Sequence, residues 1–176
     1  MTTFAQQKQA VLEKWLEQTL ATYPSQTLRF LHKEKDRFRN PVGHTLREGL
    51  ATLLEAVTGE MDPARVGPAL ESIVRLRAVQ DFTPSQAVGF VYLLRDILAE
   101  EWAGDRNAAI PAAGSRGEAA AASPSPQAIQ KRIDELALAA FDQFMKCREE
   151  IGEIKAREAQ RKVYVLERMS QRASGG

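Results

Sequence analysis

The chain has 176 residues, of which 44% are apolar and 27% are charged. That length and composition are typical of one globular domain with a substantial core, and they exclude a wholly disordered chain. Its 24 basic and 23 acidic side chains leave a net charge of +1, which provides no general attraction to nucleic acid or to anionic membranes.

The features that report on the cellular compartment favour the cytoplasm. Cys147 is the single cysteine, so no internal disulfide can form and a reducing environment is expected. The N-terminus becomes polar after Phe4 and lacks the basic-then-apolar order of a signal peptide. No stretch approaches the ~18 consecutive apolar residues of a membrane-spanning helix. We therefore expect a cytoplasmic protein that does not insert into membranes.

Helical periodicity begins at the N-terminus. From Thr3 to about Thr22 the apolar residues form one broad helical stripe, made up of Phe4, Val11, Leu12, Trp15, Leu16 and Leu20. The Tyr23-Pro24 step favours the end of this helix, and residues 27–31 predict a further helical turn or two.

Three more predicted helices begin with the same signal, a capping residue followed by proline at the first helical position. The signal occurs at Asn40-Pro41, Asp62-Pro63 and Thr83-Pro84. Gly59 suits the end of the first of these helices, and Gly67-Pro68 is expected to delay the start of the second by a turn. The helix after Pro84 is apolar on more than one side, which predicts a central position in the core.

Residues 103–126 differ from the rest of the chain in composition. They are rich in alanine, glycine, serine and proline and contain few large apolar side chains. Such a segment cannot bury enough surface to offset the entropy lost on ordering. We expect a flexible loop inserted into one domain of residues 1–176, because the helix that follows needs packing partners from the segments that precede it.

The last predicted helix runs from about Pro126 to about Arg172. Its apolar residues recur at steps of 4, 3, 4, 4, 3 and 4, namely Ile129, Ile133, Leu136, Ala140, Phe144, Cys147 and Ile151. This spacing approaches an eleven-residue repeat and predicts a nearly straight helix. Ala137, Phe141 and Met145 are expected to widen the stripe that packs into the core. After Ile154 the apolar density falls, so residues 152–172 are expected to project from the core.

These patterns, with no competing strand pattern in the sequence, predict an all-α fold. We expect a helical bundle of about five main helices with a long C-terminal helix, and a globin-like arrangement is one option for it.

The sequence lacks patterns for catalysis or metal binding. Its two histidines, His32 and His44, are twelve positions apart and do not form the close ligand pair of a zinc site. No glycine-rich phosphate loop or dinucleotide fingerprint occurs. The most basic stretch, residues 29–39, contains two acidic residues and two phenylalanines, which favours a solvated loop over a nucleic-acid site. We therefore expect a protein that is not an enzyme, with no catalytic residue, metal or cofactor.

Three stretches resemble the RsbRD N-terminal domain family, whose namesake heads an RsbT co-antagonist of bacterial stress signalling. They are DRFRNPVGHTLREGL (36–50), RLRAVQDFTPSQAVGFVYLLRDIL (75–98) and ELALAAFDQFMKCREEI (135–151). The resemblance implies an all-helical regulatory input module that is often dimeric and similar in role to the non-haem globin-like domains of other RsbR paralogues. In multidomain relatives an output domain follows a long exit helix, so here we expect a separate protein partner to supply the output. The resemblance implies no catalytic residues.

The two functional hypotheses concern different faces of the last helix. The first is a signalling or scaffold module that forms a homodimer and docks a partner through the thin apolar stripe of Ala159, Val163, Leu166 and Met169, which would otherwise be left in water. The second is a small-molecule, haem or redox sensor that uses Phe141, Phe144 and Met145 as an apolar lining or Cys147 as a reactive thiol. Because Cys147 lies on the apolar stripe, a buried, unreactive side chain is the first expectation for it.

Overall fold

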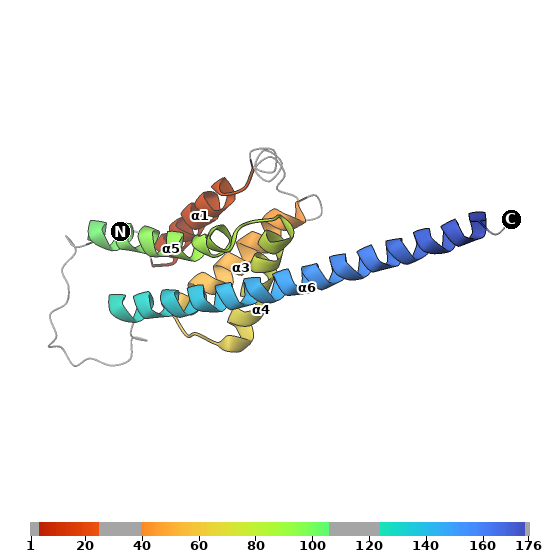
Figure 1. Ribbon diagram of the computed structural model, residues 1–176. Helices are drawn as coiled ribbons and strands as arrows, with labels where there is room; N and C mark the ends of the chain where they lie inside the picture. The colour runs from red at the N-terminus through yellow and green to blue at the C-terminus, as the bar shows by residue number, and fades with distance from the viewer. Residues whose placement is uncertain (1–3, 25–39, 106–123, 175–176) are drawn as a thin grey trace.

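The computed structural model describes residues 4–24, 40–105 and 124–174. In these ranges the chain forms five α-helices and no strand, namely α1 (Phe4–Ala21), α3 (Pro41–Thr58), α4 (Pro63–Val79), α5 (Pro84–Asp105) and α6 (Pro126–Ser174) (Figure 1). The predicted all-α class and the long C-terminal helix are thereby confirmed. The predicted turn at 27–31, the basic stretch at 29–39 with His32, and most of the expected loop at 103–126 lie outside the described residues.

The capping residues and prolines expected to open helices at 41, 63 and 84 do so. The side chains of Asn40 and Asp62 accept hydrogen bonds of 2.8 and 2.9 Å from backbone N–H groups in the first turns of α3 and α4. At the start of α5, Gln86 Oε1 accepts from the Thr83 N–H at 3.0 Å while Thr83 Oγ1 accepts from the Gln86 N–H at 3.4 Å. This reciprocal arrangement is a capping box, which satisfies two backbone donors that the helix itself leaves unpaired.

Two predicted helix boundaries were wrong. The start of α4 is not delayed, because Asp62 caps it at Pro63 and the helix simply accommodates Pro68, which is exposed, in its second turn. The loop expected from 103 begins later, because α5 continues to Asp105.

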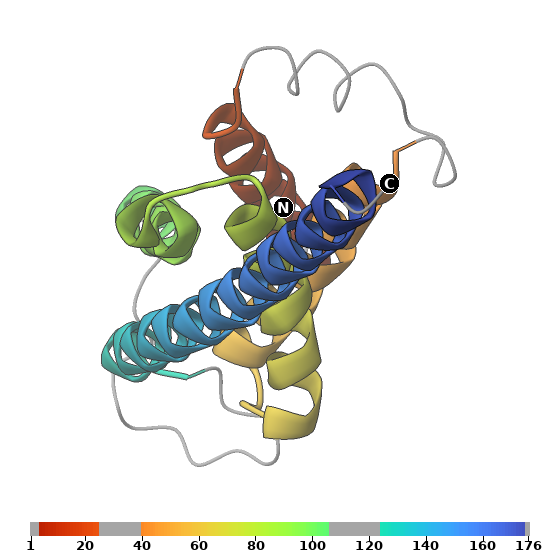
Figure 2. The ribbon, with the colours of Figure 1, turned by 45° about the vertical axis from the view of Figure 1, so that its right-hand side comes forward.

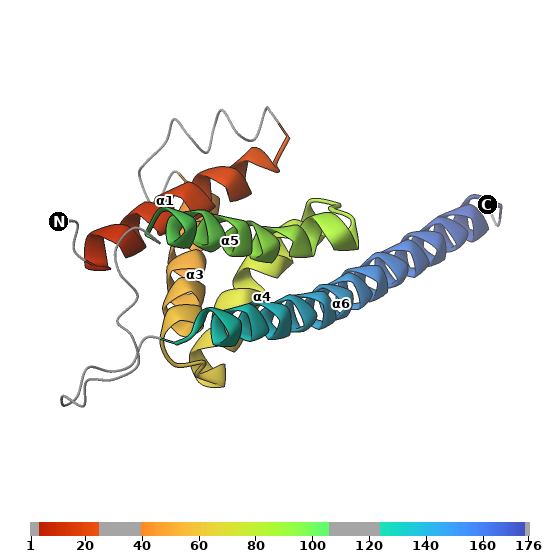
Figure 3. The same cartoon turned by 90° about the vertical axis from the view of Figure 1, so that its left-hand side faces the viewer.

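The core lies where α1, α3, α4, α5 and the first half of α6 meet. In Figures 1 and 3, α3 and α4 run between α1 on one side and α6 on the other. As its sequence predicts, α5 is central: it packs against both α1 and α6 and buries Ala87, Val88, Phe90, Val91, Leu94, Ile97 and Leu98. The fully buried Trp15 of α1 donates its Nε1–H to the Phe90 carbonyl at 2.6 Å, so even this polar atom is satisfied inside the core.

The two halves of α6 have different surroundings. Up to Cys147 its core-facing stripe is buried, and Ile151 is half-buried. From Gly152 to Gln171 every side chain is exposed. Figures 1 and 3 show this second half extending away from the other helices toward the C-terminus, and in Figure 2 it points toward the viewer in front of them. At 1.5 Å per residue, the 49 residues of α6 span roughly 70 Å.

The expectation that Phe141 and Met145 widen the core-facing stripe of α6 was wrong. Their side chains are 45% and 40% exposed, whereas Phe144 beside them is 1% exposed. The reason is that α6 lies across one side of the bundle, mainly against α4 and α5, so its opposite side has no helix to pack on. Ala137, the third member of the expected widening, is buried as predicted.

Candidate functional site

The residues of the predicted partner surface all lie on the exposed half of α6. Ala159, Val163, Leu166 and Met169 are exposed, and Leu166 has the largest exposed fraction of the three large side chains among them, at 66%. Ile154, Tyr164 and Val165 are exposed on the same half of the helix. Scattered apolar side chains are normal on a protein surface, whereas contiguous exposed apolar patches are typical of interaction sites. We call these seven residues the exit-helix surface.

The charges along this half of α6 support the helix itself. Arg157 Nη2 and Glu153 Oε2 are 3.0 Å apart in an i,i+4 pair in which both side chains are largely exposed. Such a pair contributes only about 0.3–0.5 kcal/mol. The helix beyond Gly152 therefore has no large internal source of stability, since most helical stability in proteins comes from tertiary packing.

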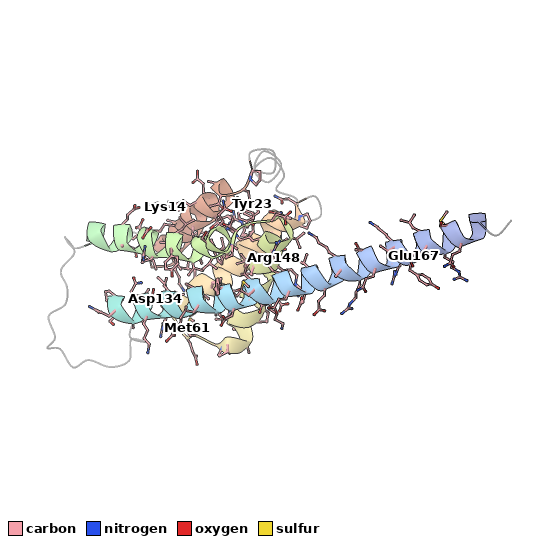
Figure 4. All side chains as sticks on the ribbon, viewed as in Figure 1. Lys14, Tyr23, Met61, Asp134, Arg148 and Glu167 are labelled. Carbon is pink, nitrogen blue, oxygen red and sulfur yellow. The ribbon has the colours of Figure 1, made fainter. Side chains whose placement is uncertain are left out.

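Three arginine contacts fix the direction in which α6 leaves the bundle. Arg132 donates to the Val57 and Gly59 carbonyls at 2.9 and 2.7 Å, which satisfies two acceptors at the end of α3. Arg148 donates to the Ala78 carbonyl at 3.3 Å and to Asp81 Oδ1 at 3.1 Å. The third contact joins Arg75 to Glu150 at 3.3 Å. Figure 4 shows Arg148 on the part of α6 beside the other helices and Glu167 far out on the projecting half.

A buried arginine lies next to the Arg148 contact. The Arg77 guanidinium is fully buried, and its carbon Cζ lies 5.0–5.2 Å from the ring centroids of Tyr23, Phe82 and Phe90. Within the described ranges no carboxylate forms an ion pair with it. Burial lowers the pKa of Arg77 and raises that of Tyr23, although a guanidinium stays protonated in proteins. The three aromatic faces offset part of the desolvation cost of this cation.

The Arg77 side chain also ties three helices together. Its Nη1 donates to the Gln86 carbonyl of α5 at 2.8 Å, and its Nη2 donates to Thr22 Oγ1 at 3.0 Å and to the Thr19 carbonyl at 3.4 Å, at the end of α1. Through these hydrogen bonds the Arg77 guanidinium holds α5 and the end of α1 against the end of α4.

These contacts give structural roles to several residues of the segment RAVQDFTPSQA (77–87), which is part of the stretch 75–98 that resembles the family. Arg77 opens it, Asp81 adopts a left-handed conformation at φ 58° that turns the chain, and Phe82 supplies one ring around the guanidinium. Thr83 and Gln86 then cap α5. Asp81 tolerates the left-handed region better than most residues because its short polar side chain can bond locally.

The sequence analysis did not identify Arg77 as a buried residue that joins several helices. The signal was present, because Arg77 continues the apolar register of α4 four residues after Ile73 and three after Val74. A charged residue at a predicted core position means either that the helical register was assigned wrongly or that the core contains a buried polar group with its own partners. Its aromatic partners lie on other helices, so they could not be paired with it from spacing alone.

The residues proposed for a ligand or redox site do not gather on one face. Cys147 and Phe144 are buried, as expected for Cys147, and the amide Nε2 of Gln143 lies 3.8 Å from the sulfur. Phe141 and Met145 lie outside, as described above. His44, in the first turn of α3, pairs with Glu48 at 3.0 Å, and no group of three metal-ligating side chains occurs in residues 4–24, 40–105 and 124–174.

The comparison with protein families supplies the context for this geometry. Residues 9–159 match the model of the RsbT co-antagonist protein rsbRD N-terminal domain. The chain belongs to this family. An RsbRD N-terminal domain is part of a co-antagonist, which indicates a regulatory signalling role. The match covers α3, α4 and α5 in full and ends on α6 before Val163.

No curated protein and no solved structure matches the chain. None of the helices in the part of the chain that the structure describes is long and apolar enough to span a membrane.

Proposed function

We propose that this RsbRD N-terminal domain is a non-catalytic regulatory module of bacterial stress signalling that forms a homodimer and docks a protein partner through the exposed half of α6. The family supports the regulatory role. The contact surface is supported by the exposure of Val163, Leu166 and Met169 on a helix that extends beyond the bundle. Fully burying one such side chain is favourable by about 1.5–3 kcal/mol.

The proposal assigns separate tasks to the two halves of α6. The buried half, held by Arg132 and Arg148, fixes the angle at which the helix leaves the bundle. The exposed half carries the contact. A change in the bundle that alters the packing of the first half would therefore move the contact surface as a rigid continuation of the same helix.

The dimer is tested by multi-angle light scattering on the full chain and on the V163E/L166E variant. We expect the full chain to have twice the 19.5 kDa mass of one copy and the variant to have the mass of one, because charges replace apolar contact side chains. The matched control is R161Q/R168Q, which lowers the net charge by the same two units at exposed positions outside the exit-helix surface. A monomeric full chain at all concentrations would overturn the dimer.

The alternative function, a redox sensor, is tested at Cys147. Because the thiol is 2% exposed, we expect it to react with a thiol reagent only after unfolding in denaturant. Rapid modification of the folded chain would favour the sensor over the contact module.

A further inference from the structure

The spacing of residues on α6 changes where the helix leaves the bundle. From Ile129 to Ile151 the core-facing residues follow steps of 4, 3, 4, 4, 3 and 4, close to an eleven-residue repeat. Beyond that point a second row of small or apolar residues follows steps of 4, 3, 4, 3 and 4, and we call it the heptad seam: Gly152, Ala156, Ala159, Val163, Leu166 and Ser170. A seven-residue repeat keeps one row in continuous contact with a second helix when the two wind around each other in a left-handed supercoil.

The heptad seam does not face the bundle. At about 100° per residue its centre lies roughly a third of a turn around α6 from the buried stripe. All six of its residues are exposed. A Cβ added at Gly152, the seam residue nearest the bundle, would meet no described atom within 4 Å. The small side chains of Ala156 and Ala159 leave room for a second helix to approach closely.

The charges beside the seam favour a second copy of the same helix. Lys155 and Lys162 precede the seam residues Ala156 and Val163, and Gln160 and Glu167 follow Ala159 and Leu166. In a parallel, in-register coiled coil, a residue that precedes the seam in this way, such as Lys155 or Lys162, faces the residue five positions further on in the partner helix. Lys162 would then face Glu167 of the second copy, twice by symmetry, and Lys155 would face the neutral Gln160. In an antiparallel pair, Lys155 and Lys162 of one copy would instead lie on the same side as the lysines of the other copy, and these like charges would repel.

We propose that the heptad seam packs against the same seam of a second copy in a parallel, in-register coiled coil, with reciprocal Lys162–Glu167 pairs. The inference rests on the proposed function and deepens it by assigning the orientation and register of the two copies in the homodimer. Three of the six seam residues, Val163, Leu166 and Ser170, lie beyond residue 159, where the family match ends. Tyr164 and Val165 lie outside the seam, and they stay accessible on the dimer for a different protein.

The charge pair is tested by analytical ultracentrifugation of K162E and E167K. Each variant places like charges opposite each other twice, and we expect the dimer dissociation constant to rise about tenfold. An equimolar mixture of the two variants restores both opposite-charge pairs, so we expect it to dimerise like the wild type, as should K162E/E167K. The matched control is K155E, which faces Gln160 and is expected to leave the dissociation constant within about twofold.

The mixing result separates a contact between copies from an effect within one helix. Residues 162 and 167 are five apart and do not face each other on one helix, so restoration by mixing requires two chains. If K162E behaves like K155E, or if mixing restores nothing, the parallel register is wrong. If either result is found and V163E/L166E still abolishes the dimer, the proposed function stands and only this inference fails.

Orientation is tested by a cysteine at the far end of the seam. In a C147A background, S170C places two thiols opposite each other only when the helices are parallel and in register. We expect mild oxidation to cross-link S170C quantitatively and to leave Q171C, one position around the helix, largely uncross-linked. A cross-link that is equally weak at both positions, or binding of the seam only to a protein other than this chain, would overturn the proposal.

Discussion

The two halves of α6 belong to one continuous helix but depend on different sources of stability. The half up to Ile151 buries Ile133, Leu136 and Phe144 against the bundle, whereas the half from Gly152 to Gln171 is exposed along its whole length. The first half is stable because the rest of the domain covers it. The second half has only local helical interactions, which are weak. We propose that the stabilising contacts of this second half come from a second chain.

The comparison is tested most strongly by the same substitution in each half. We expect L136A to lower the free energy of unfolding by about 2–5 kcal/mol, because Leu136 is fully buried and its loss leaves a cavity. In dilute, monomeric protein, L166A should change it by less than about 0.5 kcal/mol. Urea denaturation followed by circular dichroism measures both. Equal losses at the two positions would mean that the halves are not distinct.

The second test compares a buried arginine with an exposed one. R77A removes the cation between Tyr23, Phe82 and Phe90 and leaves oxygen acceptors of α1 and α5 without their donor. We expect a loss of about 2–3 kcal/mol. R157A removes only an exposed pair with Glu153 and should cost less than about 0.5 kcal/mol. A near-neutral R77A in thermal unfolding would contradict the role assigned to this centre.

The smallest expected effect is a pH dependence that belongs to the bundle alone. Hydrogen bonds from Arg47 of α3, one of them 2.9 Å long, lower the pKa of Glu13 of α1. A depressed carboxyl pKa contributes stability that is present above the unfolded value of about 4.3 and is lost as the pH falls through the folded value. Because both side chains are nearly half exposed, the contribution should stay below about 1 kcal/mol.

This dependence is measured by urea denaturation between pH 3 and pH 7, a range chosen around the carboxyl pKa of about 4.3. E13Q should flatten the acid side of the stability profile slightly, and E17Q on the same helix is the matched control. Identical profiles for E13Q and the wild type would show that the pair with Arg47 contributes nothing.

The sequence predicts local features of this fold better than relations between helices. Helix starts at Pro41, Pro63 and Pro84 follow from a capping residue and a proline that are adjacent in the chain. The burial of Phe144 and Cys147 follows from a stripe of period near 3.6. The exposure of Phe141 and Met145 did not follow, because it depends on which sides of α6 the bundle covers.

The same limit applies to the candidate site. Val163 and Leu166 were assigned to a contact surface because they belong to an apolar stripe that would otherwise be left in water, which is a local signal. The Arg77 centre was missed because its partners come from α1 and α5, and no spacing in the chain brings these helices together.

Hydrogen–deuterium exchange of the full chain at increasing protein concentration tests the central claim most directly. If the exposed half of α6 is a contact surface between copies, amides of residues 152–171 should exchange more slowly as the concentration rises through the dimer dissociation constant. Amides of residues 129–151 should stay equally protected throughout. Fast, concentration-independent exchange at residues 152–171, beside a protected first half, would contradict the account.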